Sequence, residues 1–324
     1  MRTVCLVLVT LVAAACSAPA PTTGAPAGSA PSASAPPGAE PAVAASLQAL
    51  VDAEMPKIPA RGGLWVKHLT TGEEASYHAD DVFNSASVIK IPVAVQALEM
   101  AEAGTLSLAA RLTLREQDVR GGSGIFRYHD PGLQPTLRDV LLQMIITSDN
   151  TATDLAIAQV GGVEKVNAWL AAKGYADGMK LVQTTGELFA KYAALAPADD
   201  RNAKTNGDHA YWLGELTPRA TGRMLEAIEA RTLPSKPGAE ELLRMMRAQQ
   251  AGARRLPHFL PPGVSVAHKT GDFPPVLAND VGIVYTASGP VVVSFFLNAI
   301  TEPYGEAEDR MGRLTAEIVR YFDR

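Results

Sequence analysis

The chain has 324 residues, 47% of them hydrophobic, so it is long enough and apolar enough to bury a large core. Its formal net charge is −5 with both signs interspersed, which gives no reason to expect nucleic acid as a partner. The six histidines are scattered without metal-ligand spacing, so neither a metal site nor a cofactor is expected.

The start of the chain has the pattern of an export signal. Arg2 precedes an apolar run over residues 4–15, which suits the core of a signal peptide but is too short to span a bilayer. The run ends in three alanines before Cys16, an arrangement similar to a bacterial lipoprotein processing site, although Ala13 replaces the usual leucine. Ordinary secretory cleavage near residues 13–18 is the alternative. We expect an exported protein, periplasmic or at the cell surface, that is anchored to a membrane by a lipid on Cys16.

A spacer of small residues follows this signal. Residues 17–45 are almost entirely Ala, Pro, Ser, Gly and Thr, which cannot bury apolar surface, so a disordered linker is expected. The predicted organisation is therefore a signal peptide over residues 1–16, a linker over 17–45 and a folded catalytic domain over 46–324. Cys5 lies in the removable segment, which leaves Cys16 without a partner for an intramolecular disulfide.

The first half of the folded domain combines a hairpin with helices. Residues 64–69 and 74–78, joined by a turn that contains Gly72, predict a β-hairpin. A helix with an apolar body is predicted over residues 87–101 and ends before Gly104. Further helices are predicted from apolar periodicity and capping residues over 136–147, 151–160, 163–173, 217–230 and 239–250.

The hydrophobic period changes toward the end of the chain. Strands are predicted over residues 264–269, 281–286 and 291–297, and a last helix over residues 306–322. Strands at both ends around a helical middle predict an antiparallel sheet built from the two ends, with an inserted helical lobe. The cleft between the sheet and this lobe is the expected binding site.

Three short motifs fall at the ends of these elements: Ser87-Val88-Ile89-Lys90, Ser148-Asp149-Asn150 and Lys269-Thr270-Gly271. A serine hydroxyl is a weak nucleophile until a basic neighbour takes its proton. A lysine three residues further along a helix lies on the same face as the serine. The apolar residues around Lys90 predict that its amine is buried and needs a polar partner. Gly271 allows a ligand to approach the strand edge closely.

Each motif also has a purely structural interpretation. Taken by itself, Ser87 would be a helix cap followed by a solvated lysine, and residues 148–150 would form a typical corner between two helices. Taken by themselves, residues 269–271 would be a charged strand end followed by a turn. The three motifs together, in this order and in these settings, favour a catalytic site.

With these motifs the chain resembles the class A β-lactamase family of penicillin-recognising serine hydrolases, over roughly residues 47–322. The segment from Ala251 through Arg255 to the strand with Lys269 is similar to one subgroup of that family. The resemblance implies a mixed α/β (α+β) fold of the serine β-lactamase/transpeptidase type. In that fold an antiparallel five-stranded sheet is flanked by helices and carries an inserted all-helical lobe.

The resemblance also implies a role for each motif residue. Ser87 would attack the lactam carbonyl while Lys90 and Ser148 transfer protons. The N–H groups of Ser87 and Asp272 would form the oxyanion hole. The remaining positions would bind substrate: Asn150 the amide side chain, and Lys269, Thr270 and Arg255 the carboxylate.

Two departures from the family pattern concern deacylation and substrate. The E-x-x-L-N string that carries the deacylating glutamate is absent. Glu187 stands at about the right chain position and is the candidate base, but Thr184 and Glu187 also form a capping-box pattern that begins a short helix. Asp272 stands where the family usually has a small or hydroxyl residue. Its carboxylate would repel an acidic substrate unless Arg255 or Lys269 neutralises it.

Three functions therefore remain open. The first, which we favour, is a β-lactamase that opens penicillin- and cephalosporin-type substrates through a Ser87 acyl-enzyme that water hydrolyses. The second is a D-alanyl peptidase-type cell-wall hydrolase that β-lactams acylate but that deacylates slowly. The third is a non-catalytic lipoprotein that binds β-lactams or peptidoglycan. A protein that only binds has no need of an activated serine, which argues against this third function. The expected enzyme is a monomer with a small-molecule β-lactam as its partner and with membrane contact only through Cys16.

Overall fold

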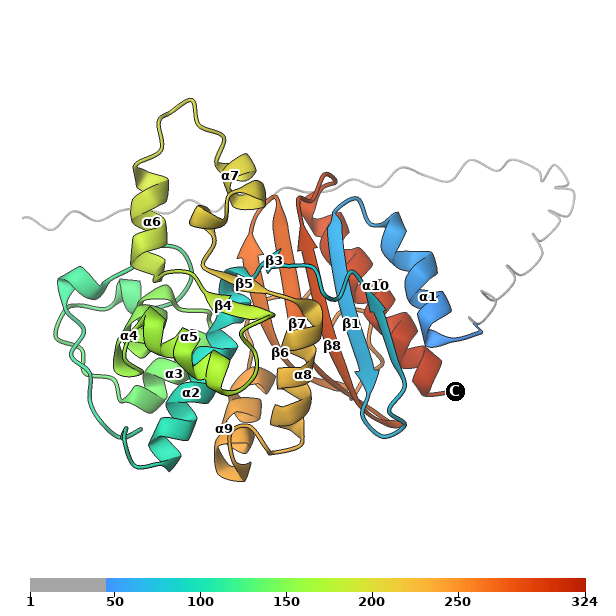
Figure 1. Ribbon diagram of the computed structural model, residues 1–324, viewed down its shortest axis with the longest axis horizontal. Helices are drawn as coiled ribbons and strands as arrows, with labels where there is room; N and C mark the ends of the chain where they lie inside the picture. The colour runs from blue at the N-terminus through green and yellow to red at the C-terminus, as the bar shows by residue number, and fades with distance from the viewer. Residues whose placement is uncertain (1–44) are drawn as a thin grey trace, which may run out of the picture. The chain divides into compact units, whose positions relative to one another are not determined.

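One antiparallel sheet joins strands from both ends of residues 45–324, the part of the chain that this computed structural model describes (Figure 1). Its strands are β1 (Arg61–His68), β2 (Glu74–Tyr77), β6 (Ser265–Phe273), β7 (Leu277–Thr286) and β8 (Gly289–Asn298). They lie in the order β2-β1-β8-β7-β6. The predicted hairpin and five-stranded antiparallel sheet are therefore confirmed. The predicted signal peptide, Cys16 and the linker up to residue 44 lie outside the described residues.

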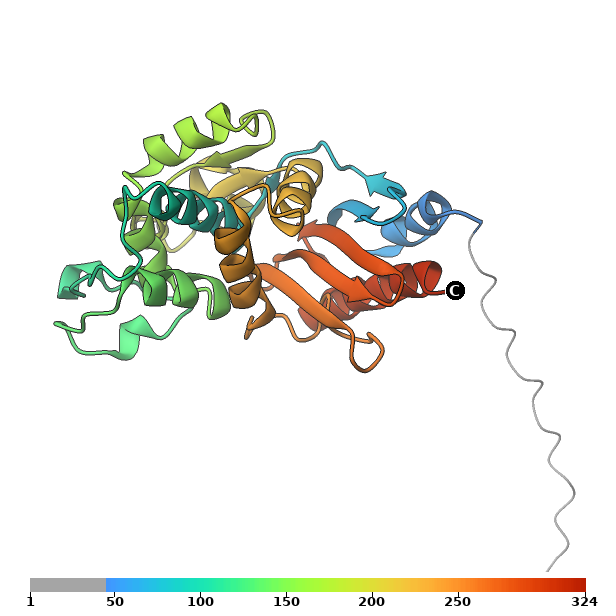
Figure 2. The ribbon, with the colours of Figure 1, turned by 90° about the horizontal axis from the view of Figure 1, so that it is seen from below.

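Helices cover both faces of the sheet, and each face has its own apolar core. Helices α1 (Leu47–Glu54) and α10 (Tyr304–Phe322) pack against one face. Helix α8 (Pro218–Glu229) covers the other face together with the helical lobe (Figures 1 and 2). A Cβ on Gly222 of α8 would lie only 2.0 Å from the ring of Trp65, so this glycine sets how closely α8 approaches β1.

The inserted lobe is helical, as predicted. Its helices are α2 (Lys90–Glu102), α3 (Leu137–Ile146), α4 (Asn150–Gln159), α5 (Val163–Ala172), α6 (Thr185–Ala193), α7 (Arg201–Gly207) and α9 (Lys236–Arg247). Helix α3 begins at the predicted cap, because the Thr136 hydroxyl accepts the N–H of Asp139 at 3.2 Å. None of the helices in residues 45–324 is long and apolar enough to cross a membrane.

Two predicted boundaries differ from the structure at the site itself. The helix predicted over residues 87–101, α2, begins at Lys90 rather than at Ser87, because residues Ala86–Ile89 form a tighter 3-10 turn. Strand β6 does not end at Lys269 but continues to Phe273, since pairing with β7 extends to Leu277. A small second sheet, in the order β3-β5-β4, lies beside the turn and was not predicted; its strands are β3 (Phe83–Asn84), β4 (Met179–Leu181) and β5 (Gly214–Leu216).

Candidate active site

Ser87 lies on a turn that its neighbours hold in place. Ala86, directly before it, has a positive φ of 41°, which is strained for a residue with a Cβ. Asn84 accepts the N–H of Ala86 at 3.0 Å. Asn279 of β7 donates its amide to the carbonyls of Asn84 and Ser85 at 2.9 and 3.2 Å. The turn is therefore fixed by amide side chains from two sheets rather than by its own backbone preference.

Lys90, one helical turn after Ser87, is fully buried. Its Nζ donates to the carbonyl and the hydroxyl of Ser148 at 2.7 and 3.2 Å, and to Oδ1 of Asn150 at 2.9 Å. Burial, together with the nearby charge of Lys269, holds the pKa of Lys90 well below its usual range. A buried amine of this kind is suited to accept a proton, and its polar partners come from the second motif.

The second motif is a corner between α3 and α4 that serves the structure as well as the site. The Asp149 carboxylate caps α4 by accepting the N–H of Ala152 at 2.9 Å. It also accepts the N–H groups of Ile125 and Phe126, both at 2.7 Å. Asp149 therefore has the predicted structural role of a helix cap, and it holds the loop over residues 119–130 beside Ser148.

Strand β6 runs close to the Ser87 turn because Gly271 has no side chain. A Cβ on Gly271 would lie 2.4 Å from the carbonyl oxygen of Ser85 and 3.2 Å from the nitrogen of Ser87. The strand backbone thus lies beside the N–H of Ser87, in the arrangement from which an oxyanion hole can be built.

Lys269 is fully buried on the same strand, and its Nζ donates to the carbonyl of Thr270 at 2.9 Å. Burial lowers the pKa of Lys269 to about 8, although the carboxylates of Asp272 and Asp280 favour its charged form. The hydroxyl of Thr270 is also buried and has no hydrogen-bond partner within residues 45–324. The third motif therefore contributes a positive charge and an unpaired hydroxyl behind the cavity wall.

Arg255 is paired with protein groups on several sides. Its Nη2 donates to the carboxylate of Asp272 and, at 2.9 Å, to the hydroxyl of Tyr304. Its Nε donates to Glu308 at 2.9 Å, and its Nη1 donates to the carbonyl of Asn279 at 2.8 Å. Burial disfavours the charge of Arg255, but Asp272, Tyr304 and Asp280 together exceed this effect and raise the pKa of Arg255. Of the two cations considered for Asp272, Arg255 is the one that contacts it.

A cavity of about 380 Å³ brings several of these groups together. Ser87, Ser148, Asn150 and Asp272 line it. Four other predicted site residues are fully or almost fully buried and do not line it: Lys90, Lys269, Thr270 and Arg255. Much of the remaining wall is apolar or aromatic, with Leu188, Phe189 and Tyr192 of α6, Tyr211 and Leu213 before β5, and Phe273 of β6. Sequence reasoning missed this wall, although Phe189 and Tyr192 stand one turn apart on the short helix it predicted.

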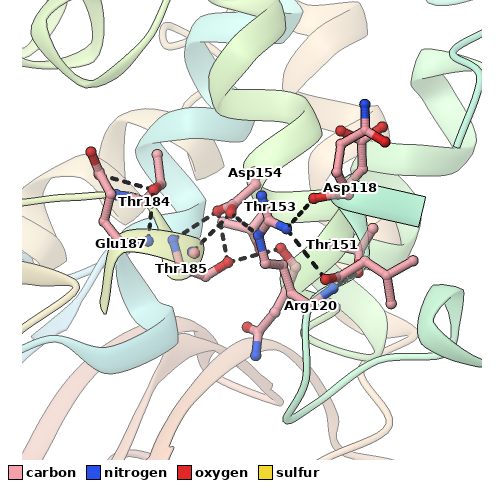
Figure 3. A network of polar contacts seen from close by, with 12 residues as sticks. Asp118, Arg120, Thr151, Thr153, Asp154, Thr184, Thr185 and Glu187 are labelled. Carbon is pink, nitrogen blue, oxygen red and sulfur yellow. Dashed lines mark hydrogen bonds and ion pairs between the residues drawn. The ribbon is translucent and has the colours of Figure 1, made fainter. Parts of the chain in front are cut away.

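Glu187 does not line the cavity and is exposed. Its Oε2 accepts the N–H and the hydroxyl of Thr184 at 2.8 and 2.9 Å, while the Thr184 hydroxyl accepts the N–H of Glu187 at 3.2 Å (Figure 3). These bonds from Thr184 lower the pKa of Glu187. The geometry is that of the capping box that begins α6, and Thr185 is the neighbouring residue that lines the cavity.

Asp154 ties the start of α6 to Arg120. Its Oδ1 accepts the N–H and the hydroxyl of Thr185, both at 2.7 Å (Figure 3). Its Oδ2 accepts the N–H of Gly186 at 2.9 Å and Nε of Arg120 at 2.7 Å. The carboxylate of Asp154 is thus committed to four donors and lies outside the cavity lining. No group of three or more metal-ligating side chains that could hold a metal ion occurs in residues 45–324.

Comparisons with known proteins agree with this architecture. A family model described as the beta-lactamase enzyme family matches residues 42–322. Beta-lactamase L2 of Stenotrophomonas maltophilia is 26% identical over 284 residues, with 86% of each chain covered. The crystal structure of a beta-lactamase from Sphaerobacter thermophilus is 27% identical and has a TM-score of 0.71, covering 85% of this chain and 95% of that one.

A further solved structure shares the fold at lower sequence similarity. The structure of PBP-A is 23% identical with a TM-score of 0.72, and it covers 87% of this chain and 98% of that one. The fold of this chain is therefore shared with both of these solved structures. Because the family model spans most of the sequence, the chain belongs to the beta-lactamase enzyme family.

Proposed function

We propose that this enzyme opens penicillin- and cephalosporin-type β-lactams through an acyl-enzyme on Ser87, which water then hydrolyses. The observation that carries the proposal is the fully buried amine of Lys90, which lies one turn from Ser87 and contacts Ser148 and Asn150 at one cavity. Membership of the beta-lactamase enzyme family supports the substrate class. A non-catalytic binding protein has no need of such an amine, which argues against that alternative.

In the proposed acylation, Ser87 Oγ attacks the lactam carbonyl carbon while its proton passes to the Lys90 amine, directly or through Ser148. The C–N bond breaks, the nitrogen takes a proton from Ser148 or Lys90, and the opened ring stays attached to Ser87 as an ester. The N–H groups of Ser87 and Asp272 stabilise the oxyanion, for which one donor typically contributes about 2.7–4 kcal/mol. Water then cleaves the ester, which restores the Ser87 hydroxyl and releases the acid.

We further propose that the second step is slow, because the cavity offers little to activate the water. Among the lining residues within 45–324, Asp272 alone carries a carboxylate, and Arg255 and Tyr304 bind it. Thr185 and Leu188 of α6 line the wall where the sequence had suggested Glu187 as a base. A general base is worth roughly 10²- to 10⁴-fold in a proton-transfer step. This observation favours, as a second candidate, a D-alanyl peptidase-type hydrolase whose β-lactam acyl-enzyme persists because deacylation is slow.

A time course with a chromogenic cephalosporin, followed by intact mass, tests both steps. We expect a burst of one equivalent, a persistent adduct that maps to Ser87, and a slow steady rate. The Ser87→Ala variant should give neither burst nor adduct. An adduct on the Ser87→Ala variant would refute the assignment of Ser87 as the nucleophile. Many fast turnovers without an adduct would show that an efficient base exists and would exclude the slow-release proposal.

A further inference from the structure

The loop over residues 119–130 holds the second motif through several hydrogen bonds. The carbonyl of Gly121 accepts from Nδ2 of Asn150 at 3.0 Å, and the carbonyl of Ser123 accepts the N–H of Asn150 at 3.2 Å. The hydroxyl of Ser123 donates to the carbonyl of Ser148 at 2.7 Å. One bond from this loop therefore reaches the serine of the motif itself.

The carbonyl of Ser148 accepts from two donors that have different origins. One is the Ser123 hydroxyl, and the other is Nζ of Lys90, also at 2.7 Å. We propose that Ser123 is a positioning residue for acylation, which acts on Ser148 and Lys90 through this shared carbonyl. The inference deepens the proposed function and rests on the acylation of Ser87.

Ser148 has a strained backbone that its contacts must hold. Its φ is 55°, a left-handed conformation that is costly for a residue with a Cβ and persists where the surroundings fix it. Its hydroxyl lies 3.2 Å from Nζ of Lys90, so a relaxed backbone would move this hydroxyl away from the amine. The bond from Ser123 thus helps to keep the Ser148 side chain directed at Lys90.

The same bond affects the charge of Lys90. A protonated lysine has three N–H donors, and their acceptors here are the hydroxyl and carbonyl of Ser148 and Oδ1 of Asn150. Because two donors compete for one carbonyl oxygen, the Ser123 hydroxyl makes this carbonyl a weaker acceptor for the ammonium. Burial is the main cause of the lowered pKa of Lys90, and we expect the Ser123 bond to act in the same direction.

The other influences on Lys90 do not involve Ser123. The charged groups that act on the amine are Lys269, which disfavours its charge, and Asp149, Asp154 and Asp272, which favour it. Ser123 is exposed and lines the cavity, so a bound β-lactam displaces water that would otherwise replace a lost hydroxyl. A change in pH dependence after substitution of Ser123 therefore reports on the hydroxyl.

The Ser123→Ala variant of the full chain tests the inference. The acylation rate constant is taken from the burst with a chromogenic cephalosporin as a function of pH, and chemical denaturation gives the stability. We expect the rate constant at neutral pH to fall about 3- to 10-fold, as the loss of one hydrogen bond implies. The acidic side of the profile should move to higher pH, because the freed carbonyl binds the Lys90 ammonium better. Ser123→Thr, which keeps the hydroxyl, should restore both.

The controls separate positioning from a purely structural role. Ser235→Ala removes an exposed hydroxyl that makes no capping bond at the start of α9 and lies outside the cavity lining, so it should change neither quantity. An unchanged rate constant and pH profile in Ser123→Ala would overturn the inference. So would a loss of stability without a shift of the acidic side. Absence of a burst and an adduct in the unmodified chain would instead contradict the acylation of Ser87.

Discussion

In the proposed mechanism, the reactivity of Ser87 depends on two buried amines in opposite roles. The lowered pKa of Lys90 leaves its amine able to take the serine proton. We propose that Lys269 acts while it is charged, because a cation on the strand that passes the Ser87 turn would also stabilise a developing oxyanion. The same burial that prepares Lys90 also limits the pH range in which Lys269 keeps its proton.

The rate of acylation by an uncharged β-lactam ester should therefore rise and then fall with pH. Below the lowered pKa of Lys90 the amine binds a proton and cannot act as a base. Above about pH 8 Lys269 loses its charge, so the rate declines on the alkaline side. Arginine does not titrate in this range, so Lys269→Arg should remove the alkaline decline. A decline that persists in Lys269→Arg would assign it to another group.

At the residue scale, the sequence predicted that Lys90 is buried but not which groups it contacts. The apolar neighbours Ile89 and Ile91 indicate burial, and burial requires a partner. The choice between Arg255 and Lys269 as the partner of Asp272 could not be made from spacing. It depends on Tyr304 and Glu308 of α10, which approach Arg255 only once the sheet and the last helix have packed.

At the scale of elements, the capping box decides what Glu187 does. Its carboxylate binds the N–H and hydroxyl of Thr184 at the first turn of α6 and is exposed. Such a reciprocal pair satisfies donors that the start of a helix leaves unpaired. Because α6 carries Leu188, Phe189 and Tyr192 into the cavity wall, the cap supports the site indirectly.

Replacement of Glu187 by alanine should lower the free energy of unfolding by about 0.3–1.5 kcal/mol, the usual contribution of a helix-terminal device. The rate at which the Ser87 adduct disappears should not change. Chemical denaturation measures the first quantity and intact mass the second. Thr184→Ala, which removes the other partner of the capping box, should give a similar loss of stability. A slower deacylation in Glu187→Ala at unchanged stability would restore Glu187 as the base.

Long periodic elements were predictable from the sequence, whereas the local geometry of the site was not. The hairpin, the last three strands and the helices predicted over residues 136–147, 151–160, 163–173, 217–230 and 239–250 have clear apolar periods, and the structure contains them. Helices α1 and α7 were not predicted. The turn at Ala86–Ile89 was predicted as regular helix, because the contacts that tighten it come from Asn84 and Asn279. The aromatic wall combines Tyr192, Tyr211 and Phe273 from separate parts of the chain, and no local pattern connects them.

At the scale of the whole molecule, the export signal and the anchor remain predictions about residues outside the described range. If a lipid on Cys16 holds the protein at a membrane, Cys16→Ser should move it to the soluble fraction after cell lysis and centrifugation. Cys5→Ser, in the segment predicted to be removed, is the matched control and should not change the fractionation. A protein that is soluble before either substitution would favour ordinary secretory cleavage.

The pairing of β1 with β8 has a consequence for how this molecule acquires its structure. Arg61 of β1 lies opposite Asn298 of β8, and the whole helical lobe intervenes between them in the chain. The loop-closure entropy of contacts so distant in sequence must be overcome before the pairing stabilises the sheet, which slows folding. The turn that carries Ser87 needs Asn279 and Asn298 from those last strands, since Asn298 accepts the N–H of Asn84 at 2.9 Å. We therefore expect that a ribosome-bound or partly translocated chain that still lacks β7 and β8 cannot form the Ser87 adduct, so that activity would appear only when synthesis is nearly finished.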